Sequence, residues 1–144
     1  MNKLSSILAR KGNNAINVSP GTTVLQALEI MAEKNIGSVV VMENDRYLGI
    51  VSERDYSRKV ILKGKNSAET TAADIMSTDL PHLKPADTID QCMQLMSDKH
   101  IRYLPVFDKG QLAGIISMSD VVNAIIANQK DTISHLENYI NSAV

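Results

Sequence analysis

Two stretches of the sequence decide the fold: Gly49-Ile50-Val51-Ser52-Glu53-Arg54-Asp55 and, 65 residues later, Gly114-Ile115-Ile116-Ser117-Met118-Ser119-Asp120. In each stretch an apolar run follows a glycine, which is typical of a buried strand. The Ser-x-x-Asp that comes next is typical of the start of a helix. The same strand-to-helix transition therefore occurs twice in the chain.

The repeat extends outward from these two stretches. Residues 20–55 align with residues 85–120 without a gap, and 11 of the 36 positions are identical. Chance would give about two identities in such a search for internal repeats. Other aligned positions, such as Val24 and Ile89, keep their apolar character. The chain is therefore a duplication of one unit.

Hydrophobic periodicity predicts the same order of elements in both copies. An extended piece at 15–18 or 80–83 is followed by a helix, for which Thr22 and Asp87 are candidate caps. Two strands and a second helix beginning near Asp55 or Asp120 complete each β-α-β-β-α unit. The expected strands are residues 37–42 and 47–51 in the first copy, and residues 103–107 and 112–116 in the second. Val60, Ile61 and Leu62 are expected on the apolar face of the helix that follows Asp55.

One such unit is too small to hide its apolar surface alone. The predicted fold class is therefore α/β (α+β), with two β-α-β-β-α repeats packed as a pseudo-two-fold pair, plus a C-terminal helix. The expected domains are residues 1–67, which include an N-terminal lead-in, and residues 68–128. In the expected helical tail, 129–144, Ile133, Leu136 and Ile140 have helical spacing, so the tail could dock on the body or on a partner.

Composition narrows the functional classes. The chain has 144 residues, of which 15 are basic and 16 acidic, so no overall field attracts nucleic acid or an anionic membrane. The chain has no 18-residue apolar run, no signal-peptide pattern at its start and a single cysteine, Cys92, which favours a cytoplasmic location. Cys92 aligns with Ala27 in an apolar stripe, which favours core packing over a reactive thiol. The histidines His82, His100 and His135 lack metal-ligand spacing, so no metal is expected.

The two opening stretches, together with Asp74-Ile75-Met76 and Ile101-Arg102-Tyr103-Leu104-Pro105-Val106, resemble the CBS domain, a family named after cystathionine β-synthase. The resemblance covers roughly residues 3–129, and the tandem copies are similar to a Bateman module in a stand-alone two-CBS-domain protein. It implies that the pair binds an adenosine-containing ligand in clefts between the two copies. It also implies a homodimer in which the copies meet head to head through their Asp-led helices.

The residues themselves suit a nucleoside. A Ser-x-x-Asp at a helix start brings a hydroxyl, free backbone N–H groups and a carboxylate to one rim. The carboxylate can accept from two adjacent ribose hydroxyls, and the hydroxyl and N–H groups can meet phosphate oxygens. The alternative is that Ser52, Asp55, Ser117 and Asp120 only cap helices.

The resemblance implies nucleotide contacts from both copies. One cleft would use Ile50, Ser52, Arg54 and Asp55 with residues near Leu80, Pro81 and His82; the other would use Ile115, Ser117, Ser119 and Asp120; opposite these would lie Asn17, Val18, Ile36, Gly37, Ser38, Ile101 and Arg102. Gly37 aligns with Arg102, so one copy leaves room for a base where the other offers a guanidinium for phosphate. The two clefts need not be equivalent. Arg54, Arg58 and Lys59 could also serve phosphates, although an exposed helical face explains Arg58 and Lys59 equally well.

These features favour a non-catalytic regulatory module that senses an adenine nucleotide. AMP is the first choice of ligand, NAD is a serious competitor, and ATP, ADP and S-adenosylmethionine remain open. An enzyme would need an arranged acid, base or nucleophile, and Asp55 or Asp120 alone supplies only a generic carboxylate. The alternative function is a ligand-free structural or protein-interaction scaffold that acts through homodimerisation. In either case the output must reach a regulated protein that the sequence does not identify.

Overall fold

The chain forms two compact units, and neither is continuous in sequence. The computed structural model describes residues 2–12 and 15–142. The first-repeat unit comprises Asn14–Pro81 and Lys109–Leu112, and the second-repeat unit comprises Met1–Asn13, His82–Asp108 and Ala113–Val144. The opening helix thus belongs with the second repeat. The predicted boundaries at 67/68 and 128/129 follow the order of the sequence and stay a prediction.

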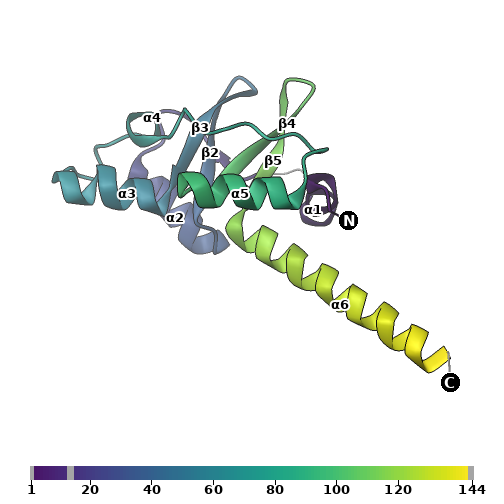
Figure 1. Ribbon diagram of the computed structural model, residues 1–144. Helices are drawn as coiled ribbons and strands as arrows, with labels where there is room; N and C mark the ends of the chain where they lie inside the picture. The colour runs from purple at the N-terminus through teal and green to yellow at the C-terminus, as the bar shows by residue number, and fades with distance from the viewer. Residues whose placement is uncertain (1, 13–14, 143–144) are drawn as a thin grey trace. The chain divides into compact units, whose positions relative to one another are not determined.

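A three-stranded sheet forms the centre of the first-repeat unit (Figure 1). Its strand β1 pairs in parallel with β2, and β2 pairs antiparallel with β3, placing Ser38 opposite Ser52. Asn44 and Asp45, both with positive φ, form a two-residue turn between β2 and β3. In chain order the elements are β1 (Asn17–Val18), α2 (Val24–Lys34), β2 (Ser38–Glu43), β3 (Arg46–Ser52), α3 (Glu53–Lys59), the 3-10 turn η1 (Ile61–Lys63) and α4 (Ala72–Ile75).

Aliphatic side chains from the helices and the strands form the core of this unit. Val24 and Met31 of α2 pack with Val39 and Val51 of the central strands, and Ile75 of α4 completes the cluster. All five are almost fully buried. The apolar positions three and four apart in the helix therefore meet the alternating positions of the strands, as the periodicity predicts.

The second-repeat unit repeats this plan with a smaller sheet. Its elements are α1 (Leu4–Lys11), α5 (Ile89–Lys99), β4 (Tyr103–Asp108), β5 (Gln111–Ser117) and α6 (Met118–Ser142). The expected strand at 80–83 is wrong, because Leu83 makes only one parallel bridge, to Val106. Pro81 and Pro85 flank that bridge, and neither has a backbone N–H to extend the ladder.

The mixed α+β fold class and the C-terminal helix are confirmed, but the predicted caps are wrong by one residue. Thr23 caps α2: its Oγ1 accepts from Gln26 N at 3.1 Å, and Gln26 Oε1 accepts from Thr23 N at 3.0 Å. Thr88 and Gln91 make the same capping box on α5. Thr22 and Asp87 instead accept backbone N–H groups in the turns before these helices.

Two helix ends also differ from expectation. Helix α3 ends at Lys59, so Val60, Ile61 and Leu62 do not lie on its apolar face. Val60 is buried, whereas Ile61 and Leu62 are exposed on the 3-10 turn that follows. The tail is not a separate helix, because α6 runs without a break for 25 residues. No glycine or proline stands within α6 to stop it. No helix in the described part of the chain is long and apolar enough to cross a membrane.

The glycines at equivalent positions of the two repeats allow a neighbouring segment to approach the last strand closely. A Cβ on Gly49 would lie 2.6 Å from the carbonyl oxygen of Ser77, and a Cβ on Gly114 would lie 2.7 Å from Leu8 Cδ2. Ser77 pairs with Ile50 of β3 by two backbone hydrogen bonds. Glycine is therefore required more strictly at 49, because paired backbone cannot move aside as the end of a leucine side chain can.

We predict that Gly49→Ala lowers the free energy of unfolding by about 2 kcal/mol, since overpacking of this kind costs about 1–3 kcal/mol. The matched variant Gly114→Ala should cost less, because Leu8 can change rotamer. Urea denaturation of both variants measures the difference. Equal losses would contradict the distinction between backbone and side-chain contact.

Candidate functional site

The Ser52–Asp55 pair forms a reciprocal cap where β3 ends and α3 begins. Asp55 N donates to Ser52 Oγ at 3.2 Å, and Asp55 Oδ2 accepts from Ser52 N at 2.9 Å. Ser52 Oγ also lies 3.0 Å from Asp55 Oδ2. The sequence folds this way locally because both residues satisfy N–H groups that have no partner within the helix.

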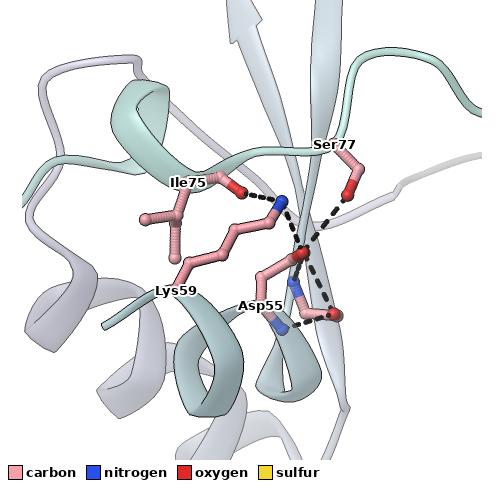
Figure 2. Close-up of polar contacts among 5 residues, drawn as sticks. Asp55, Lys59, Ile75 and Ser77 are labelled. Carbon is pink, nitrogen blue, oxygen red and sulfur yellow. Dashed lines mark hydrogen bonds and ion pairs between the residues drawn. The ribbon is translucent and has the colours of Figure 1, made fainter. Parts of the chain in front are cut away.

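The other oxygen of Asp55 is also in use. Asp55 Oδ1 lies 2.9 Å from Lys59 Nζ and accepts from Ser77 Oγ at 3.2 Å. Lys59 Nζ donates in addition to the carbonyl oxygen of Ile75 at 2.8 Å, so one lysine joins α3 to the end of α4 (Figure 2). The Asp55 side chain is only 11% exposed. The carboxylate therefore ties three segments of the first-repeat unit together.

Asp120 holds the equivalent place in the second-repeat unit with fewer contacts. Its Oδ2 accepts from Ser117 N at 2.9 Å, and Asp120 N donates to Ser117 Oγ at 3.1 Å. Lys11 Nζ lies 2.7 Å from the same Oδ2 and donates to the carbonyl oxygen of Ile115 at 2.8 Å. Among the described residues, Asp120 Oδ1 has no hydrogen-bond partner, and the side chain is 20% exposed. This carboxylate therefore keeps acceptor capacity.

The aligned residues Gly37 and Arg102 lie beside these helix starts. Glu53 N donates to the carbonyl oxygen of Gly37 at 3.1 Å, and Met118 N donates to that of Arg102 at 2.9 Å. The backbone carbonyl of each residue accepts from the first N–H of the neighbouring helix, so Gly37 and Arg102 differ only in their side chains. At this position the second unit has the exposed Arg102 where the first has Gly37, whereas the first unit has Arg54 within the first turn of α3, where the second has Ser119.

The structure places the predicted site residues at three levels of exposure. Exposed are Asn17, Arg54, His82, Arg102 and Ser119; half-buried are Ile36, Gly37, Ser38, Ser52, Pro81, Ile101, Ser117 and Asp120; buried are Val18, Ile50, Asp55 and Ile115. Ser38, Gly37, Ser52 and Asp55 are brought together at one strand end, as are Arg102, Ser117 and Asp120 at the other. That each larger set lines one cleft stays a prediction.

Two further predicted residues have structural roles of their own. The ring of His82 stacks on Phe107, with the ring centroids 4.2 Å apart. The amide of Asn17 donates to the carbonyl oxygen of Ala15 at 3.3 Å. Among the described residues, no group of His, Cys, Asp and Glu side chains could hold a metal ion.

Lys11 and Ser77 are site residues that sequence reasoning missed. Lys59 stands four residues after Asp55, a spacing that does signal an ion pair on a helix. Lys11 is more than a hundred residues from Asp120, and it aligns with Met76 in the other repeat, so no pattern indicates its role. Its contact exists because α1 belongs to the second-repeat unit.

Cys92 lies in the core of the second-repeat unit, as expected from its apolar stripe. Its side chain is fully buried in α5. Burial, with a smaller contribution from the carboxylates of Asp87 and Asp120, raises the pKa of the Cys92 thiol to about 11. The thiol therefore stays protonated near neutral pH and is a poor nucleophile.

Comparison with known proteins identifies the family. The CBS domain family model matches twice, at residues 6–61 and 72–127. The chain belongs to the CBS domain family and contains a tandem pair of these domains. Pairs of this kind are regulatory modules that typically bind adenosine-containing ligands, and stand-alone CBS-domain proteins are generally not catalytic.

Several relatives are similar over most of their length. The mitochondrial CBS domain-containing protein CBSX3 of Arabidopsis thaliana is 35% identical, with 95% of this chain and 71% of the relative covered. The CBS domain-containing protein YhcV of Bacillus subtilis is 28% identical over 88% of this chain and 89% of its own. A solved structure of a putative signal-transduction protein with CBS domains from Burkholderia ambifaria has a TM-score of 0.84 at 38% identity, covering 88% and 96% of the two chains. Because one relative is mitochondrial, the cytoplasmic location remains a proposal.

We predict that Asp55→Ala lowers the free energy of unfolding by about 2 kcal/mol and Asp120→Ala by about 1 kcal/mol. Both variants lose one half of a capping box and the carboxylate partner of a lysine, but Asp55→Ala also leaves the Ser77 hydroxyl without its acceptor and acts at the more buried side chain. Urea denaturation without added ligand measures both. A larger loss for Asp120→Ala would contradict this ranking.

Cys92 should react with a thiol reagent such as dithionitrobenzoate far more slowly in the folded protein than in urea. At pH 8 a thiol with a pKa of about 11 is about one part in a thousand thiolate. Raising the pH from 7 to 9 should increase the native rate about tenfold per unit, because the pH stays below the pKa. Rapid labelling at pH 7 in the folded state would show that the thiol is accessible and ionised.

Proposed function

We propose that the chain is a non-catalytic sensor that binds an adenosine-containing nucleotide at its Ser-x-x-Asp rims. AMP is the first choice, NAD is the main competitor, and ADP, ATP and S-adenosylmethionine are the other candidates. The observation that carries the proposal is the repeated geometry: in both units a carboxylate is held at a strand-to-helix junction by a capping hydroxyl, with a lysine ammonium beside it.

This geometry offers a binding partner for both the ribose and the phosphate of a nucleotide. A carboxylate oxygen can accept from ribose hydroxyls, which is the bidentate contact that the residue type favours. The lysine next to each carboxylate is partly exposed, 43% for Lys59 and 40% for Lys11, so its flexible stem can turn the ammonium toward a phosphate.

The rim at Asp120 is the stronger candidate of the two. Asp120 has an oxygen without a partner among the described residues, whereas both oxygens of Asp55 are occupied by Ser52, Ser77 and Lys59. A ribose at Asp55 would have to displace contacts that stabilise the unit. A second cation does not separate the rims, because Arg54 stands beside Asp55 in sequence and the backbone of Arg102 contacts the start of α6. We therefore propose that the Asp120 rim binds first.

Regulation requires a second state to which the ligand binds differently. We propose that this state is an arrangement of a homodimer, through which an unidentified regulated protein is reached. No nucleic acid and no membrane is part of this proposal, because the net charge of −1 provides no field for either.

The test is the shift in Tm of the full chain with AMP, ADP, ATP, NAD and S-adenosylmethionine. A ligand at a hundredfold excess over its Kd stabilises the folded protein by about 2.7 kcal/mol, which raises Tm by several degrees. We expect one or two ligands to do so, and we expect Asp120→Ala to remove the shift. Chromatography of the nucleotide after incubation checks that it is not turned over.

Asp74→Ala is the matched control. Asp74 also closes a capping box, with Thr71 on α4, but its carboxylate is exposed and lies outside the predicted site. It should lower Tm and leave the ligand shift intact. Absence of any shift, with dimerisation retained, would favour the ligand-free scaffold, and consumption of the nucleotide would favour an enzyme.

A further inference from the structure

The C-terminal half of α6 has an apolar stripe that the rest of its unit does not cover. Figure 1 shows this half of the helix extending past α5 and α1, and every residue from 129 to 141 is exposed. Ile133, Leu136 and Ile140 are 55%, 57% and 61% exposed, and Tyr139 is 74% exposed. A helical segment of this length is marginal in water unless its apolar face packs against something.

The spacing of these residues is that of a coiled coil. Ile126, Ile133 and Ile140 fall seven residues apart, and Val122, Gln129 and Leu136 each precede one of them by four residues, so the two sets occupy the a and d positions of a heptad. Val122 and Ile126 are also exposed large apolar residues. The stripe therefore runs along α6 from Val122 to Ile140 with one polar member, Gln129, and it is narrow enough for one helical partner.

Charge favours an antiparallel partner with the same sequence. Lys130 and Glu137 both occupy e positions beside the stripe. In an antiparallel pair e residues face e residues, so pairing Ile133 with Leu136 of a second copy brings Lys130 next to Glu137 of that copy, twice by symmetry. In a parallel pair e faces g, where Ile125 and Thr132 offer no opposite charge.

A groove in the second-repeat unit lies where such a partner would end. It has a volume of about 410 Å³ and is lined by Ile89 of α5 and by Ile125, Gln129, Thr132 and Ile133 of α6, among others. Thr132 and Tyr139 both occupy g positions of the heptad, and g residues face g residues in an antiparallel pair. Tyr139 of the second copy would therefore stand opposite Thr132, which lines this groove. The most exposed apolar side chain of α6 would thus find an apolar space beside the seam.

We propose that residues 129–140 of α6 form an antiparallel helix pair with the same segment of a second copy of this chain. The pair has Ile133–Leu136 layers at its centre, Lys130–Glu137 ion pairs at its edges, and Tyr139 of each copy in the groove of the other. This inference deepens the proposed homodimer and does not depend on nucleotide binding.

The test is sedimentation equilibrium of the full chain and four variants. Leu136→Asp, which places a charge in the seam, and Lys130→Glu, which replaces two attractions with two repulsions, should each weaken association by about tenfold or more. The double variant Lys130→Glu with Glu137→Lys should restore it, because the charges then pair in reverse. Asp131→Lys, on the outer face of the helix, is the matched control and should change little.

A dimer that survives Leu136→Asp, or a double variant that fails to recover, would overturn the proposal. Disulfide capture provides a second readout, with Cys92→Ala as the background. When Ile133→Cys and Leu136→Cys proteins are mixed, antiparallel pairing gives the mixed disulfide, whereas parallel pairing gives the two self-linked species and would overturn the register. Nucleotide-induced Tm shifts should persist in all tail variants, so the two proposals fail separately.

Discussion

The two units depend on a reciprocal hydrogen bond between a serine and an aspartate three residues apart. The serine ends a buried strand and the aspartate begins the next helix, so the cap fixes the angle at which the chain leaves the sheet. In each unit the carboxylate and the lysine that are proposed to meet a ligand lie at this corner, beside the backbone of Gly37 or Arg102. In the proposed function, the carboxylate that caps the helix is also the acceptor for the ribose hydroxyls.

Local sequence rules predicted a large part of the fold. The duplicated Ser-x-x-Asp, the alternating strands and the helical stripes are short-range patterns, and the structure confirms the mixed α+β class they indicate. Errors arose where a neighbouring residue competed for the same role. Thr22 and Asp87 are good capping residues by type, but the preceding turns use them, and Thr23 and Thr88 take the cap because Gln26 and Gln91 can return the hydrogen bond.

The candidate site was predictable only to the extent that it is local. Ser52, Asp55, Ser117 and Asp120 follow from spacing, and the contrast of Gly37 with Arg102 follows from the alignment of the repeats. Lys11 and Ser77 reach their carboxylates from distant segments of the chain, and no periodicity encodes that approach. The length of α6 was underestimated for a different reason. The end of the repeat suggests the end of a helix, but a repeat boundary does not itself stop a helix.

The membership of α1 in the second-repeat unit has a consequence for synthesis on the ribosome. Once residue 81 has emerged, the first-repeat unit has its sheet, its helices and the Ser77 strand contact, and it lacks only Lys109–Leu112. The second-repeat unit needs Leu4, Ile7 and Leu8 of α1, and these side chains must wait until the residues from 82 onward are made. During that interval α1 lacks the surface that buries its apolar side chains in the folded unit, so these side chains stay exposed while the intervening residues are synthesised.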